Sequence, residues 1–148
     1  MSSLEFWETM SGAYHFVDKP HDERPMSFTI RAKSPPMLRF LRRPEVEIEG
    51  EIFAPGLANH RHARGTLGMD VLRTGTLPYR FSFVGDDGRS YVFQGQKDVS
   101  PFALLETMTA LPGSIRDEHG VEVAVALLRF DARSDLLTFL RSFRLARV

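Results

Sequence analysis

Two histidines separated by a single residue are the first feature of this sequence that could do chemistry. His60 and His62 would share one face of a β-strand. Imidazole nitrogens are common zinc ligands, and His15 or Asp70 would be candidates for a third ligand. The pair also follows residues 55–59, whose proline, glycine and asparagine are typical of a solvated loop. We therefore expect a loop at this place and no metal site.

A second group combines a phenol, an imidazole, an ammonium and a carboxylate. Tyr14 and His15 lie near the start of the chain, and Lys97 and Asp98 lie in its second half. If strands bring the four to one mouth of a barrel, burial and neighbouring charges could tune a general acid and a general base. The alternative, which we favour, is a packed Tyr14 with its hydroxyl hydrogen-bonded, and a strand end that holds Lys97 and Asp98 in water.

Common catalytic signatures are absent from the sequence. It contains no Gly-x-Ser-x-Gly, no phosphate-binding loop and no His-Glu-x-x-His. It also contains no cysteine, which excludes a disulfide framework, a thiolate zinc site, an iron–sulfur cluster and a cysteine nucleophile. We expect no cofactor.

Composition limits the class of protein further. The 148 residues suit one domain, over residues 1–148, and the 19 acidic residues balance the 19 basic ones. Without net positive charge there is no general electrostatic attraction to a nucleic-acid backbone. The longest apolar run has six residues, from Val123 to Leu128, so we expect no membrane span. The first residues do not resemble a signal peptide, and we expect a cytoplasmic protein.

Alternation of apolar and polar residues runs through most of the chain and is typical of β-strands whose two faces differ. Met26, Phe28 and Ile30 alternate with polar residues, and glutamates occupy every other position from Glu45 to Glu51. The glutamate row could attract a cationic partner or a metal, but it is also typical of the solvated face of an antiparallel sheet. We expect the solvated face.

A β-hairpin is predicted around residues 85–88, which read Gly-Asp-Asp-Gly. Asp-Gly provides the positive backbone angle that a tight turn needs. Aromatic residues of matching parity flank the turn on both sides, which predicts cross-strand packing. These residues are Tyr79, Phe81, Phe83, Tyr91 and Phe93.

The last strong pattern covers residues 121–130, which are apolar at both parities and are typical of a strand covered on both faces. A helix over residues 131–144 is the expected cover. A serine followed by two prolines predicts another short helix over residues 36–43. Further strands are expected over residues 4–16, 65–72 and 104–115.

These elements together predict an all-β fold. We expect an antiparallel closed or nearly closed barrel, lipocalin-like, of about seven to nine strands with two short helices. A closed barrel has no exposed sheet edges, which favours it over an open sheet.

The order of motifs resembles a known family. Residues 4–12 read Leu-Glu-Phe-Trp-Glu-Thr-Met-Ser-Gly, residues 91–99 contain Gly-Gln-Lys after the hairpin, and residues 106–109 read Glu-Thr-Met-Thr. This arrangement is similar to the small all-β, lipocalin-like domain that accompanies GMC oxidoreductases of the cholesterol-oxidase type. Glu106 and Met108 interrupt the run of threonines that is usual there. The resemblance implies an accessory barrel near lipid or sterol metabolism, without the flavin-binding Gly-x-Gly-x-x-Gly.

Twelve phenylalanines and six methionines would line either an apolar cavity or a filled core. We expect a non-catalytic accessory barrel, monomer or homodimer, that binds an apolar, lipid- or sterol-like small molecule or docks on an oxidoreductase partner. The alternative is a small barrel enzyme, an isomerase or a cyclase, that uses proton transfer in an apolar cavity.

Gly95 is expected where two backbones approach closely or at a bulge. The candidate ligand-binding residues are Tyr14, His15, Tyr79, Phe81, Phe83, Tyr91, Phe93, Gly95 and Lys97.

Overall fold

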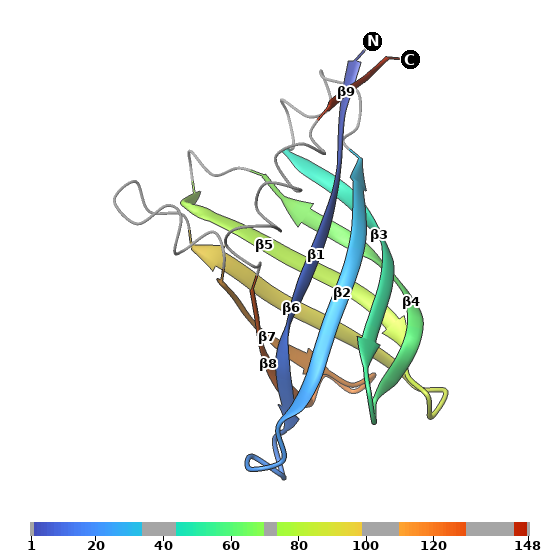
Figure 1. Ribbon diagram of the computed structural model, residues 1–148, viewed down its shortest axis with the longest axis vertical. Coiled ribbons are helices and arrows are strands. Elements are labelled where there is room, and N and C mark those ends of the chain that lie inside the picture. Colours follow the sequence, from blue (N-terminus) through green and yellow to red (C-terminus); the bar gives the residue numbers. More distant parts are fainter. Residues whose placement is uncertain (1, 34–43, 70–73, 99–109, 130–143, 148) are drawn as a thin grey trace.

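A computed structural model describes residues 2–33, 44–69, 74–98, 110–129 and 144–147, and nearly all of these residues lie in β-strands (Figure 1). The strands are β1 (Ser2–Phe16), β2 (Arg24–Lys33), β3 (Glu45–Ala54), β4 (Ala58–Gly68), β5 (Thr76–Val84), β6 (Ser90–Asp98), β7 (Ala110–Arg116), β8 (Glu122–Arg129) and β9 (Arg144–Arg147).

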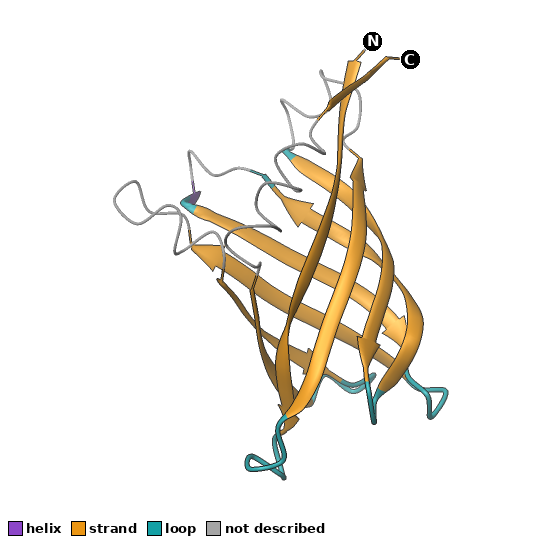
Figure 2. Ribbon diagram, in the orientation of Figure 1, coloured by secondary structure: helices purple, strands orange, loops and turns teal. Residues whose placement is uncertain are grey.

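The strands form a closed antiparallel barrel. Strands β1 to β8 pair in sequence order, and β1 closes the circle by pairing with both β2 and β8. The short strand β9 pairs with the first residues of β1, outside the eight-stranded ring (Figure 2). The predicted antiparallel barrel is confirmed, whereas its lipocalin-like identity stays a prediction.

The predicted helices cannot be compared with the structure. Residues 36–43 lie outside the described residues, as do all but the last residue of the helix predicted over 131–144. That last residue, Arg144, opens β9, a strand that the sequence pattern does not predict. No helix in the described part of the chain is long and apolar enough to cross a membrane.

The predicted hairpin is confirmed in its turn and in its cross-strand aromatic packing. Phe81 pairs with Phe93, and Phe83 pairs with Tyr91. Gly88 takes a positive φ of 81°, and the amide of Gly85 donates to the carbonyl of Arg89 at 2.8 Å. All the aromatic side chains of the pattern point into the barrel, because every second residue of a strand shares one face.

The inside of the barrel is a filled apolar core. The stacked rings of Phe81 and Phe93 have centroids 4.8 Å apart, and Phe28 from β2 meets Phe81 edge-on at 5.2 Å. These three side chains are at most 1% exposed. Of the two predicted uses of the aromatic residues, the structure shows the filled core at this level of the barrel.

The prediction for residues 121–130 is wrong for one face. Ala124 and Leu128 of β8 are buried on the inside, as expected. On the outside, however, Leu127 is 45% exposed, and Val121 in the preceding turn is 57% exposed. Apolar residues at both parities therefore do not mean two covered faces here, because Leu127 on the outer face of β8 is exposed.

The two ends of the barrel differ. At the end that we call the turn end, tight connections over residues 17–23, 55–57, 85–89 and 117–121 join neighbouring strands. At the opposite end, which we call the termini end, β2, β4, β6 and β8 finish, and both chain termini lie close together (Figure 1).

Gly95 lies where two backbones meet inside the ring. It pairs with Tyr79 on one side and with Gly113 on the other. A Cβ at Gly95 would lie 2.7 Å from the carbonyl oxygen of Pro112, far inside normal contact. The expectation of a close backbone approach is confirmed, and this approach lets β6 and β7 curve tightly around the core.

Candidate functional site

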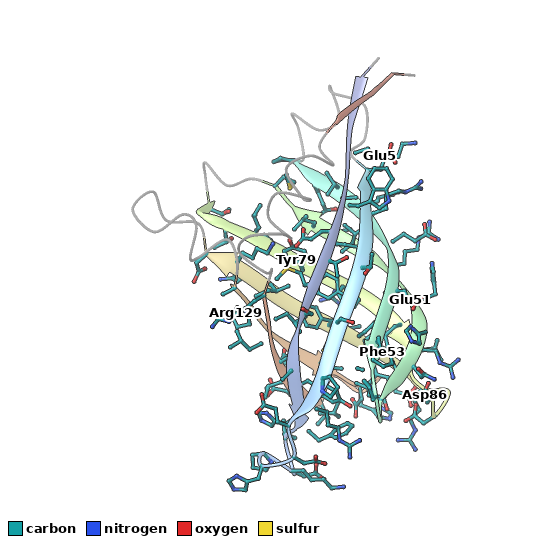
Figure 3. All side chains as sticks on the ribbon, in the orientation of Figure 1. Glu5, Glu51, Phe53, Tyr79, Asp86 and Arg129 are labelled. Atoms are coloured by element: carbon teal, nitrogen blue, oxygen red, sulfur yellow. The ribbon has the colours of Figure 1, made fainter. Side chains whose placement is uncertain are left out.

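A carboxylate, a phenol and an amine meet inside the barrel, buried from solvent. Lys97 Nζ lies 2.7 Å from Glu8 Oε1, and the Tyr79 hydroxyl donates to both Glu8 oxygens at 2.7 and 2.8 Å. Glu8 is 3% exposed, Tyr79 2% and Lys97 1%. We call Glu8, Tyr79 and Lys97 the polar bridge. Figure 3 shows Tyr79 inside the barrel, whereas Glu51, Phe53 and Asp86 lie on its outer side.

The three side chains come from opposite walls. Glu8 is on β1, whereas Tyr79 and Lys97 are on the neighbouring strands β5 and β6. In a ring of eight strands β1 and β5 are half a circle apart, so the polar bridge crosses the interior. The ammonium also lies 5.2 Å from the centre of the Tyr79 ring, a cation–π distance.

Parity along each strand directs these polar groups inward. Glu8 shares the inner face of β1 with Met10 and Tyr14, and Lys97 shares the inner face of β6 with Phe93. Each polar residue therefore occupies a position at which the pattern of its strand calls for an apolar residue.

Aliphatic side chains surround the polar bridge at the termini end. They are the first or last inward residues of their strands, and all are at most 8% exposed. Among the described residues, Glu8 and Lys97 are the only charged side chains that are buried. The aliphatic ring, as we call it, consists of Ala32, Val46, Leu67, Leu77, Leu111 and Leu128.

Burial dominates the electrostatics of the bridge. Loss of water lowers the pKa of Lys97, although the charge and hydrogen bond of Glu8 act in the opposite direction. Burial also raises the pKa of Tyr79 well above its ordinary value, and the neighbouring Glu8 carboxylate adds to the effect. The site thus holds a phenol that keeps its proton and an amine that releases its proton more readily than a lysine in water does.

A buried ion pair is not explained by stability alone. Removing two charges from water costs several kcal/mol per ion, and well-packed apolar residues in the same place are often equally stable or more stable. The polar bridge is therefore a candidate functional site, because its chemistry is not what a barrel core needs in order to fold.

Tyr14, His15, Lys97 and Asp98 do not meet at one mouth of the barrel, so the alternative that the sequence did not favour is wrong. Tyr14 is buried at the turn end, where its hydroxyl donates to the carbonyl of Pro55 at 2.5 Å. Tyr14 lies six positions after Glu8 on β1, which is about 20 Å along a strand. The predicted packing of Tyr14 with its hydroxyl bonded is confirmed, whereas the prediction of Lys97 in water is wrong.

The other predicted ligand-binding residues separate into two groups. Tyr79 and Lys97 belong to the polar bridge, with Gly95 beside them on β6. Phe81, Phe83, Tyr91 and Phe93 fill the core towards the turn end, and the Tyr91 hydroxyl bonds to Asp87 at 2.6 Å. His15 lies on the outer wall, half-buried, in a shallow hollow of about 370 Å³ between β1 and β8.

Sequence reasoning missed Glu8, the residue that unites the site. A signal was present, since Glu8 and Met10 have the same parity and the acidic residue interrupts the apolar face of the first strand. A charged residue at an inward position predicts a buried partner of opposite charge. Nothing in the sequence indicates which of the distant basic residues that partner is.

The two histidines correct another prediction. Residues 58–68 form β4, so His60 and His62 lie on a strand and not in a loop. His62 Nε2 lies 2.8 Å from Glu49, and His60 contacts Glu51 and stacks on Phe53. These glutamates are exposed, which confirms the solvated face.

Metal binding finds no support in the described residues, which contain no group of three or more ligands of the His, Cys, Asp or Glu type. The proposed third ligands do not change this. His15 lies on β1, and Asp70 lies outside the described residues.

Comparisons with known proteins find no matching family model, no matching curated protein and no matching solved structure. The resemblance to the domain that accompanies GMC oxidoreductases therefore stays a prediction, and the geometry of the polar bridge has to carry any functional argument.

Proposed function

We propose that this barrel binds a small amphipathic molecule at its termini end. The polar group of the ligand contacts the polar bridge, and its apolar part packs against the aliphatic ring. One observation carries the proposal: an amine, a carboxylate and a phenol are held together in an interior that is otherwise apolar. Ligand sites commonly combine an apolar lining with a few convergent polar groups.

The filled aromatic core decides which end of the barrel would take the ligand. Phe28, Phe81 and Phe93 occupy the interior towards the turn end, where tight connections close the strands. The polar bridge crosses the interior on the other side of these rings. A ligand that enters from the termini end would reach the polar bridge before the aromatic rings, so the polar group of the ligand would contact the bridge.

The expected ligand class is lipid-like, with a long apolar part and one polar end. Docking on an oxidoreductase partner is a separate proposal that rests on the sequence resemblance alone, and no contact of the structure favours it.

Native mass spectrometry of the purified chain tests the proposal first. We expect bound small molecules that are lost on denaturation. Thermal unfolding with a fatty acid and with a sterol then measures binding, since a ligand at 100 times its Kd stabilises the fold by about 2.7 kcal/mol. A clean apo mass together with an unchanged Tm at saturating concentrations of both would sink the proposal.

A matched pair of variants locates the site. Replacing all three polar groups, in Glu8→Leu with Tyr79→Phe and Lys97→Met, leaves an apolar interior at the bridge and should abolish the ligand-induced shift in Tm. The control is Lys33→Met, which removes an exposed lysine from the outer face of β2. Equal ligand shifts in all three proteins would place binding elsewhere.

A small barrel enzyme that uses proton transfer, an isomerase or a cyclase, is the second candidate. It is favoured by the 2.7 Å distance between the Lys97 amine and the Glu8 carboxylate in surroundings without water. Such an enzyme would exchange the α-protons of an apolar ketone with solvent deuterium, which NMR detects. Exchange at the uncatalysed rate would leave the binding function as the better account.

A further inference from the structure

The cation of the polar bridge is a lysine in a chain that otherwise uses arginine. Only three of the 19 basic residues are lysines: Lys19, Lys33 and Lys97. Lys19 and Lys33 are exposed, so among the residues whose burial the structure describes, the one buried basic residue is drawn from the rarer type. Arginine suits buried ion pairs better, because it forms more hydrogen bonds and keeps its charge. A lysine offers what arginine does not, an amine that can lose its proton and act as a nucleophile.

The surroundings of Lys97 supply what an amine nucleophile needs. Glu8 Oε1, at 2.7 Å, can accept a proton from Nζ. The Tyr79 hydroxyl holds the same carboxylate in place through both of its oxygens. Burial of Lys97 to 1% exposure keeps water away from the nitrogen, and exclusion of water disfavours the hydrolysis of an imine.

We propose that Lys97 captures an apolar aldehyde or ketone as a reversible protonated imine, which rests on the proposed binding function. The amine nitrogen attacks the carbonyl carbon after passing one proton to Glu8. A second proton moves from the nitrogen to the oxygen, which gives a carbinolamine, and Glu8 then returns its proton to the same oxygen. The C–O bond breaks, and one water leaves. The overall change is an ammonium and a carbonyl compound going to an iminium ion and water, with no oxidant or reductant.

The site suits the iminium product because its net charge is the same before and after the reaction. The ammonium and the iminium ion each carry one positive charge, so Glu8 remains their counter-ion and no new charge is buried. The neighbouring aliphatic ring offers contact to the apolar chain of the carbonyl compound. An exposed lysine provides neither a fixed carboxylate nor an apolar contact of this kind.

Reductive trapping tests the proposal on the full chain. The protein is incubated with dodecanal and sodium cyanoborohydride, and the labelled lysine is identified by peptide mass spectrometry. We expect about tenfold more label on Lys97 than on either exposed lysine. Label spread evenly over the three lysines, or absent from Lys97, would overturn the proposal.

Three variants separate nucleophile, proton acceptor and background. Lys97→Arg keeps the positive charge and should lose the preferential label, whereas Lys33→Arg should keep it. Glu8→Gln retains the amine without its proton acceptor and should reduce the Lys97 label about tenfold. Undiminished labelling of Lys97 in Glu8→Gln would show that the carboxylate takes no part. The wild-type label ratio is decisive even if a variant does not fold.

Dodecanol, which has the same chain but no carbonyl group, separates this proposal from the proposed function. If dodecanol raises the Tm and dodecanal leaves no label on Lys97, the barrel binds amphipathic molecules without imine chemistry. If dodecanol, fatty acid and sterol all leave the Tm unchanged and Lys97 stays unlabelled, both proposals fail.

Discussion

The turn end and the termini end of the barrel are stabilised by different interactions. Towards the turn end, the core consists of rings in stacked and edge-on contact, as in the Phe28, Phe81 and Phe93 group. Towards the termini end, aliphatic residues surround an ion pair that crosses the interior between Glu8 and Lys97. Both regions exclude water, but only the second contains groups whose protonation can change.

The difference shows how one fold can separate structure from chemistry. Aromatic packing contributes stability through rings that carry no titratable group, so this contribution does not depend on pH. The ion pair stabilises only as a pair, because the Glu8 carboxylate without Lys97 is an uncompensated buried charge. Substitutions should therefore reveal the contrast directly.

Truncation of the aromatic core should have the largest effect. Phe93→Ala removes a ring that is 0% exposed and touches both Phe28 and Phe81. We expect a loss of about 4 kcal/mol in the free energy of unfolding, measured by urea denaturation, because the cavity cannot collapse completely. A loss below about 1 kcal/mol would mean that the rings are not tightly packed.

Breaking the polar bridge should cost about 3 kcal/mol. Lys97→Met leaves the Glu8 carboxylate buried without its cation. The distinctive result is the recovery expected in the triple variant Glu8→Leu, Tyr79→Phe and Lys97→Met, which also removes the hydroxyl that donates to Glu8 and should have a free energy of unfolding within about 1 kcal/mol of the wild type. Additive losses in the triple variant would contradict the interpretation of the bridge as a mutually dependent group.

Gly95 lies between the two regions and should show an intermediate effect. Gly95→Val introduces a Cβ 2.7 Å from the Pro112 carbonyl oxygen, so β6 and β7 would have to separate. We expect a loss of about 2 kcal/mol in urea denaturation, caused by the clash of backbones. Its comparison is Gln96→Val at the next position on β6, which is exposed on the outer face and should change stability little.

The smallest effect belongs to the exposed turns at the turn end. The Tyr91 hydroxyl and the Arg89 amide hold the pKa of Asp87 below its ordinary value of 3.8. A carboxyl with a lowered folded pKa contributes stability above its unfolded pKa and loses it as the pH falls through the folded value. Asp87→Asn should therefore lower stability slightly at neutral pH and flatten the acid limb of the stability curve below about pH 4, where the wild type loses the same contribution.

Urea denaturation at several pH values measures this effect, with Asp18→Asn, in an exposed turn at the same end, as the control. An acid limb identical to that of the wild type would show that the Asp87 bonds do not form in solution.

The fold could be predicted from the sequence where a local pattern carried the information. The aromatic residues around the Gly85–Gly88 turn predicted a hairpin and the face on which its aromatic side chains pack, because both depend on neighbouring residues. The closed barrel followed from the number of such strands. The outer face of β8 was mispredicted, since parity shows which residues share a face but not whether anything covers that face.

The candidate site was only half predictable. Tyr79 and Lys97 lie on the two neighbouring strands of the hairpin, so the local pairing of β5 with β6 is enough to bring them close together. Glu8 is 89 positions from Lys97 and reaches it across the interior. Pairing across a barrel depends on strand order and tilt, which alternation along a single strand does not encode. His60 and His62 show the same limit, because a loop-like composition preceded a strand that its neighbours β3 and β5 define.

The position of the polar bridge also bears on the order of events in folding. Neighbouring strands can pair while the rest of the chain is still unfolded, and a hairpin forms within about 10 microseconds. Glu8 and Lys97 lie 89 positions apart, on strands that do not pair with each other. Their side chains are enclosed together in the barrel interior only when β1 pairs with β8. This pairing closes the barrel and is the slow, non-local step of such a topology. The ion pair is thus a marker of barrel closure, and the time at which Lys97 leaves water is the time at which the ring is complete.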